Sequence, residues 1–266
     1  MIELRNLTKR FDRFTAVDHL SLTIGTGEFF GLLGSNGAGK PTTISMISTV
    51  LLPTEGEIRI DGERITRKAS EQKRKLAIVT QEYSMRQDMT MDEVMDYQGR
   101  LYFLPRKERR RKTEELLAFA GLLDYRNRIV RHLSGGMKRK LMICRALMTD
   151  PQIILLDEPT AGMDAFARRQ MWDLLRQLQQ KNITIVLTTH YIEEAAALCD
   201  RVAVLHRGRL GRFAVDEVTD GRQRSRFFQT RGEAIAYLSS LPDGGQTAFR
   251  RTTLEDVFVE RVGKQS

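Results

Sequence analysis

The chain has 266 residues, a formal net charge of +9 and two cysteines. This length supports a well-buried core and excludes a mini-protein that needs staples for stability. Cys144 and Cys199 form no CxxC pair, which argues against a metal cluster or disulfide framework and favours a reducing cytosol. The positive charge is typical of a protein with an acidic partner (nucleic acid, an anionic membrane surface or polyphosphate) or of a solvated basic surface.

The N-terminal residues 1–10 carry charges every few positions and predict an alternating strand rather than the apolar region of a signal peptide. The apolar runs at 153–156 and 183–187 are far shorter than the roughly 20 residues that span a bilayer. We therefore expect a protein that is not exported, and whose role at a membrane goes through a partner.

Short apolar or alternating segments predict strands along the chain, and helical patterns lie between several of them. One such pattern places Met171, Leu174, Leu175 and Leu178 at spacings of three and four. Strands that alternate with helices imply an α/β fold with a mostly parallel sheet. The predicted strands are 2–7, 29–33, 57–60, 76–80, 153–157, 183–188 and 202–205.

Two regions depart from this alternation. From about 84 to 148 only helix patterns remain, which predicts an all-helical insert, and its basic run at 106–112 is typical of an exposed helix start. After residue 212 the chain becomes polar, with a strand-like 226–230 and helix-like 233–241 and 254–262. We predict one domain over 1–212 and a small α+β appendage over 213–266.

A glycine-rich loop follows the strand at 29–33 and leads into a helix, which is the context of a P-loop. Glycines let backbone N–H groups converge on phosphate, the helix start adds a positive end, and Lys40 neutralises the β- and γ-phosphates. The predicted nucleotide-binding residues here are Gly34, Ser35, Asn36, Gly37, Ala38, Gly39, Lys40, Pro41, Thr42 and Thr43.

Pro41 stands where the motif has the Ser or Thr whose hydroxyl ligates Mg²⁺. Proline is acceptable in a first helical turn, so the fold should survive. It removes a hydroxyl and a backbone N–H, and losing one hydrogen bond to a charged group, roughly 1.5 to 3 kcal/mol, weakens binding tenfold or more. Thr42 is a poor substitute because the next helical residue points about 100° around the axis.

Two further motifs carry polar groups. The apolar strand at 153–157 ends in Asp157 and Glu158, of which the first is suited to hold Mg²⁺ and the second to orient or deprotonate water. The segment 133–137 reads Leu-Ser-Gly-Gly-Met before a helix. Ser134, Gly135 and Gly136 therefore predict a second anion-binding site, separate from the P-loop.

This ordered set over residues 1–212 resembles the ATP-binding cassette family. The resemblance implies a P-loop NTPase core with an antiparallel β-subdomain, and a head-to-tail dimer in which 133–137 caps ATP on the opposite P-loop. It further implies adenine stacking on Phe11, Mg²⁺ sensing by Gln81, a D-loop at Asp164 and a γ-phosphate contact from His190. Phe11 could equally be a core aromatic.

The segments 187–195 and 254–258 resemble ATPases that export antibiotics, polyketides and polysaccharides, which pair with a separate membrane permease. Met85, Met89, Met91 and Met95 follow Gln81 and suit either an adaptable permease-docking surface or ordinary gap-filling in a helical core.

The leading hypothesis is a cytoplasmic ATPase subunit that uses ATP and Mg²⁺, lies on the inner face of the membrane through its permease, and forms a homo- or heterodimer. One alternative keeps the transporter but impairs hydrolysis because of Pro41. Another is a soluble nucleic-acid- or ribosome-associated ATPase, but the chain has neither tandem cassettes nor a long coiled coil, so no nucleic acid is expected.

Overall fold

The computed structural model describes residues 1–66, 68, 70–211, 213–219, 222–228, 236–237, 240 and 246–251. It divides into two compact units, which are taken in turn. Unit 1 consists of Met1–Gly25, Phe30–Thr66 and Thr188–Ser266, and unit 2 of Thr26–Phe29 and Arg67–Leu187. Among the described residues, no helix combines the length and the apolar character that crossing a bilayer requires.

Unit 1 contains an antiparallel sheet with strand order β2-β1-β4-β5. These strands are β1 (Ile2–Phe11), β2 (Phe14–Ile24), β4 (Glu55–Ile60) and β5 (Glu63–Arg64). β2 is absent from the sequence-based prediction, because shifts in the β1–β2 register break its apolar alternation. The expected antiparallel β-subdomain is thus present, and Ile2, Leu20 and Ile60 form part of its fully buried core.

Unit 1 also carries the parallel pair β3 (Phe29–Leu33) and β9 (Arg201–His206), with β10 (Arg209–Gly211) antiparallel to β9. All residues of β3 are buried, as expected for a strand covered on both faces. The helices α1 (Lys40–Ile47) and α7 (Ile192–Leu198) follow β3 and β8 (Thr184–Thr189) in the chain.

The C-terminal part of unit 1 forms its own three-stranded sheet in the order β12-β11-β13. The strands are β11 (Phe213–Thr219), β12 (Arg222–Phe228) and β13 (Gln246–Arg251). β12 includes the first residues of the strand predicted at 226–230, whose last two lie outside the described residues. Of the predicted helix at 233–241 only 236–237 and 240 are described, and the predicted helix at 254–262 lies outside the described residues.

Unit 2 combines parallel strands with a helical segment. β6 (Leu76–Val79) pairs in parallel with β7 (Ile153–Asp157). Residues 184–187 of β8 lie next to β7, on the side opposite β6. Residues 80–152, all described, contain one isolated bridge, between Thr90 and Ile129, and no strand. The helices within that stretch are α3 (Met91–Leu101), α4 (Arg106–Phe119) and α5 (Gly135–Leu147), together with the 3-10 turns Leu123–Tyr125 and Val130–His132. α2 (Ser70–Arg74) precedes the stretch and α6 (Ala165–Gln180) follows it.

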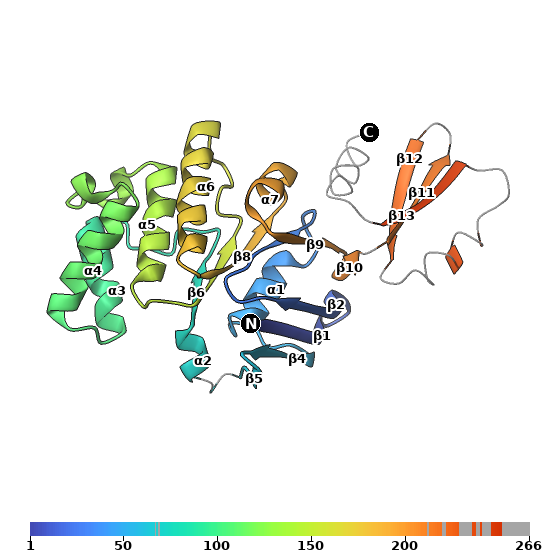
Figure 1. The fold of residues 1–266 in the computed structure, drawn as a ribbon, viewed down its shortest axis with the longest axis horizontal. Coiled ribbons are helices and arrows are strands. Elements are labelled where there is room, and N and C mark those ends of the chain that lie inside the picture. The colour runs from blue at the N-terminus through green and yellow to red at the C-terminus, as the bar shows by residue number, and fades with distance from the viewer. Residues whose placement is uncertain are drawn as a thin grey trace. The chain divides into compact units, whose positions relative to one another are not determined.

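The helix starts of unit 2 follow from their capping residues. Thr90 and Glu93 form a capping box at α3, Ser134 caps α5 and Asp164 caps α6. α3, α4 and α5 pack side by side (Figure 1). Met91 and Met95 are fully buried in this packing, so they fill gaps in the helical core.

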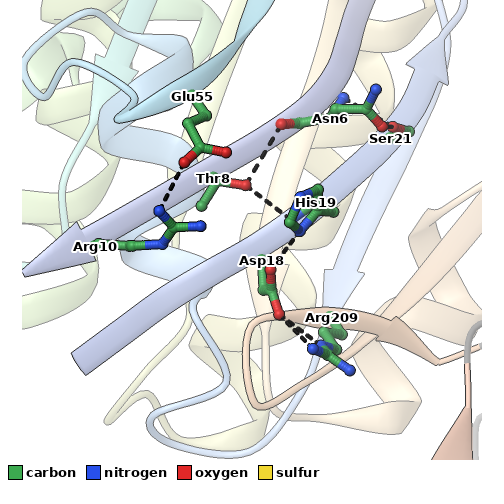
Figure 2. Close-up of polar contacts among 8 residues, drawn as sticks. All are labelled: Asn6, Thr8, Arg10, Asp18, His19, Ser21, Glu55 and Arg209. Atoms are coloured by element: carbon green, nitrogen blue, oxygen red, sulfur yellow. Dashed lines mark hydrogen bonds and ion pairs between the residues drawn. The ribbon is translucent and has the colours of Figure 1, made fainter. Parts of the chain in front are cut away.

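A polar network ties β1 and β2 of unit 1 to Arg209 of β10 (Figure 2). The buried hydroxyl of Thr8 accepts a hydrogen bond from the backbone N–H of His19, and Arg10 pairs with Glu55 at 2.6 Å. The carboxylate of Asp18 accepts from Nε and Nη2 of Arg209 at 2.7 and 2.6 Å. Burial opposes ionisation of Asp18, but hydrogen bonds from His19 and Arg209 outweigh it and lower the pKa of this carboxyl below 3.8.

Replacing Asp18 by Asn should lower the free energy of unfolding by about 1 kcal/mol near neutral pH. Because the folded-state pKa is lowered, this contribution is present above the ordinary pKa of 3.8 and is lost as the pH falls through the folded value. Chemical denaturation at neutral pH and at about pH 3 measures both points. Asp173→Asn, on an exposed carboxylate of α6, is the control. Equal effects of Asp18→Asn at the two pH values would contradict this role.

Candidate functional site

The glycine-rich loop of unit 1 is confined by its neighbours. Gly39 has φ 98°, and a Cβ on it would lie 2.5 Å from the carbonyl oxygen of Ala16. A Cβ on Gly34 would lie 2.5 Å from the carbonyl oxygen of Leu205. The backbone N–H of Gly208 donates to the carbonyl of Ala38 at 3.0 Å. Glycine is therefore required at both positions, since the loop passes close to the backbone of β2 and of β9.

Lys40 is buried at the first position of α1, with 2% of its surface exposed. Its Nζ donates to the carbonyl oxygens of Gly34 and Ser35 at 2.7 and 3.1 Å. The loop thus fixes a positive charge at the N-terminal, positive end of a helix. Both features favour an anion such as a phosphate group.

Pro41 is exposed in the first turn of α1, and the helix continues through it. The backbone N–H of Thr43 donates to the carbonyl of Gly39 at 2.9 Å, so the prediction that the fold survives proline here is confirmed. The hydroxyl of Thr43 is buried and donates to the same carbonyl at 2.9 Å. Thr42 is half-buried. The chain therefore offers no hydroxyl at position 41, and that of Thr43 is engaged within the helix.

Two more predicted residues belong to unit 1. Phe11 ends β1 with 44% of its surface exposed, and Nζ of Lys9 lies 5.1 Å from its ring centroid. The ring is therefore on the surface rather than in the core, as adenine stacking would require. His190 directly follows β8, is half-buried, and its ring centroid lies 4.1 Å from that of Tyr191.

In unit 2, Asp157 is the last residue of β7 and Glu158 follows it in a left-handed conformation with φ 46°. Both side chains are half-buried. A non-glycine residue in this region is strained, and such strain accumulates at functional sites. Among the described residues, no three His, Cys, Asp or Glu side chains form a metal cluster. The site suits Mg²⁺, which is commonly held by one or two carboxylates together with substrate phosphates and water.

Ser134 and Asp164 act as helix caps in unit 2. The Oγ of Ser134 accepts from the backbone N–H of Met137 at 3.2 Å, and Oδ1 of Asp164 accepts from that of Ala167 at 2.8 Å. Gly135 and Gly136 form the first turn of α5, directly after the exposed Ser134. The predicted anion site therefore lies at a formed helix N-terminus, whose N–H groups point outward from the first turn.

The segment 80–84 is tied to α5 by residues that the sequence analysis missed. Arg139 is buried, with 2% exposed, and donates to the carbonyls of Thr80 and Gln81. Arg145 donates to the carbonyl and the hydroxyl of Ser84. The side chain of Gln81 is exposed, while its backbone is held. Gln81 and the segment 133–137 are thus joined through α5.

No sequence signal distinguished Arg139 from its neighbours. It lies between Lys138 and Lys140, and three consecutive cations are typical of a solvated face. Burial lowers the pKa of Arg139, and the charge of Asp157 opposes that shift.

Arg139→Met should lower the free energy of unfolding by about 2 to 3 kcal/mol, because two carbonyls lose a charged donor in a buried place. Hydrogen exchange of the amides at 80–84 should become faster, and Arg139→Lys should restore part of the protection. Lys107→Met, at an exposed cation of α4, is the control. Unchanged exchange at 80–84 in Arg139→Met would show that this residue does not hold the segment.

The chain is similar to known proteins in sequence and in fold. The family model described as "ABC transporter" matches residues 17–161. The Nod factor export ATP-binding protein I of Ralstonia nicotianae is 40% identical over 209 residues, which are 79% of this chain and 65% of that protein. The chain therefore spans slightly less than two thirds of that relative.

Two further similarities agree with this match. The linearmycin resistance ATP-binding protein LnrL of Bacillus subtilis is 36% identical over 220 residues, 83% of this chain and 70% of that protein. The dimeric post-hydrolysis structure of the ATP-binding cassette MJ0796, bound to ADP and Pi, shares 28% identity and a TM-score of 0.70, covering 86% of this chain and 100% of that one. The expected P-loop NTPase fold is confirmed, and the chain belongs to the ABC transporter family as an ATP-binding cassette.

Proposed function

We propose that this chain is the ATP-binding and ATP-hydrolysing subunit of an exporter. It dimerises around two ATP molecules and drives a small molecule through a separate membrane permease. The observation that carries the proposal is the confined glycine loop with the buried ammonium of Lys40 at the start of α1. The relative named for Nod factor export supports the direction of transport.

The family pattern assigns the roles within each subunit. The loop 34–43 binds the phosphates and Phe11 stacks on adenine. Asp157 and the side chain of Gln81 would hold Mg²⁺, which would supply positive charge beside the phosphates. Glu158 orients the attacking water and accepts its proton, and His190 contacts the γ-phosphate.

The remaining residues act between subunits. Ser134, Gly135 and Gly136 cap the ATP bound to the partner's P-loop, and Asp164 stands in the D-loop beside them in the family pattern. A cap on the γ-phosphate makes ATP bind more tightly to the closed dimer than to the open one, and this difference in affinity is what drives closure. Hydrolysis removes the γ-phosphate and the dimer reopens. The dimeric ADP- and Pi-bound cassette supports such a cycle.

The partners and the domain boundary follow. A permease and a second ATP-binding subunit, identical or different, hold the chain on the cytoplasmic face of the membrane. Residues 1–212, with the helical segment at about 84–148, form the ATP-binding domain, and 213–266 form a small appendage. The closed set of pairings among β11, β12 and β13 supports that boundary.

A subunit with impaired hydrolysis is the second candidate, favoured by Pro41. The proline supplies neither a hydroxyl nor an N–H, and the hydroxyl of Thr43 already donates to Gly39. A subunit of this kind would bind nucleotide and depend on a competent partner for the reaction.

Pro41→Ser and Pro41→Ala separate these two candidates. Serine restores the hydroxyl and the N–H, whereas alanine restores the N–H alone. If the missing metal ligand limits the reaction, Pro41→Ser should raise the affinity for Mg²⁺-ATP tenfold or more and Pro41→Ala only partly. The measurements are the affinity of each purified chain for Mg²⁺-ATP and its rate of Mg²⁺-dependent ATP hydrolysis, with Glu158→Gln as the inactive reference. Equal, brisk hydrolysis by the unaltered chain and both Pro41 variants would reject the impaired subunit. The absence of hydrolysis in all three of these chains would reject the ATPase.

A further inference from the structure

Four large side chains are exposed where α3 ends and the chain turns toward α4. They are Tyr97, Leu101, Tyr102 and Phe103, exposed by 50%, 54%, 49% and 92%. We call them the aromatic corner. Single exposed apolar residues are ordinary, but a group of them on one short stretch marks an interaction surface.

Phe103 is in a conformation that glycine usually adopts. Its φ is 58°, its N–H donates to the carbonyl of Arg100 at 3.0 Å, and the N–H of Leu104 donates to that of Gly99 at 2.9 Å. This pair of hydrogen bonds is the Schellman end of a helix, where the left-handed residue is most often glycine. A phenylalanine here adds strain and gains almost no burial. The packing of the described residues therefore does not account for a phenylalanine at this position.

Three cations follow the aromatic corner at the start of α4. Arg106, Lys107 and Arg110 are exposed, and none of their side chains makes a hydrogen bond or ion pair with any residue that the structure describes. Cations near a helix N-terminus oppose the helix dipole, so they do not stabilise α4. Their neighbours differ, since Arg109 pairs with Asp96 and Arg111 with Glu115.

The carboxylates nearby leave these cations unmatched. Tyr97, Arg106 and Arg110 line a hollow of about 870 Å³ that also contains acidic residues. Asp88 pairs with Arg86, Asp92 with Arg126, and Asp96 with Arg100 and Arg109. Glu93 accepts from the neutral N–H and hydroxyl of Thr90 and keeps its charge, but five arginines line the hollow against four carboxylates. The free charge of this surface is therefore positive.

We propose that the aromatic corner and the three cations of α4 rest on an anionic membrane surface. Aromatic rings with a polar edge suit the headgroup region, and lysine and arginine are attracted to anionic lipids there. The exposed Leu101 and the strained Phe103 fit shallow insertion between lipids better than stacking on nucleic acid bases. One inserted ring and three charges give weak, reversible binding, which orients a subunit that a permease holds.

The test uses the full chain without permease or nucleotide, so its outcome is independent of ATP hydrolysis. Sedimentation with phosphatidylcholine vesicles, with and without phosphatidylglycerol, should show binding only to the anionic ones. Arg106→Gln/Lys107→Gln/Arg110→Gln should weaken that binding about 100-fold. Phe103→Gly should weaken it about tenfold while leaving thermal stability unchanged or raised.

A second triple variant controls for charge alone. Lys68→Gln/Arg74→Gln/Arg176→Gln removes three exposed cations from other parts of unit 2. It should leave vesicle binding within about twofold, because lipid attraction is local. Equal losses in the two triple variants, or equal binding to neutral and anionic vesicles, would overturn the proposal. A competition with single-stranded RNA gives a further outcome that would overturn it. In that outcome, RNA displaces the chain from the vesicles, and the α4 triple variant loses affinity for RNA as strongly as it does for vesicles.

Discussion

The ammonium group of Lys40 stays buried because the carbonyl oxygens of Gly34 and Ser35 face it. Burying an unpartnered charge is costly, so the loop must keep this curvature whether or not a ligand is bound. That curvature requires glycine at 34 and 39, where the backbones of β9 and β2 leave no room for a Cβ. The strands, the loop and the first turn of α1 are thus one arrangement, whose effect is a fixed positive charge at a helix N-terminus.

The polar network of β1, β2 and β10 supports the same loop from outside. Asp18 joins the two sides, since its N–H donates to the carbonyl of Gly208 and its carboxylate accepts from Arg209. Gly208 in turn donates to Ala38. In unit 2 the corresponding support comes from helix caps, and Ser134 and Asp164 belong both to the helix starts and to the proposed nucleotide contacts. Substitutions there change stability as well as binding, which must be separated by experiment.

The apolar strands could be predicted because a strand covered on both faces is a continuous apolar run. β3 and β7 match their predicted ranges for this reason. β2 could not be predicted, because the left-handed His19 and the register shifts against β1 disturb its alternation. The glycine loop and the carboxylates at the end of β7 could be predicted because the residues of each motif are adjacent in the chain. Arg139 was missed because only tertiary packing distinguishes a buried cation from the solvated ones beside it.

In the proposed cycle, two copies of this chain, or one copy and a homologous subunit, close around ATP. Light scattering of the Glu158→Gln variant tests it most directly, because that chain binds ATP but lacks the carboxylate proposed to activate water. Addition of Mg²⁺-ATP should raise the mass from one chain to two, whereas ADP should leave it at one. A variant that binds ATP and remains a single chain, both alone and with a homologous subunit, would contradict the account.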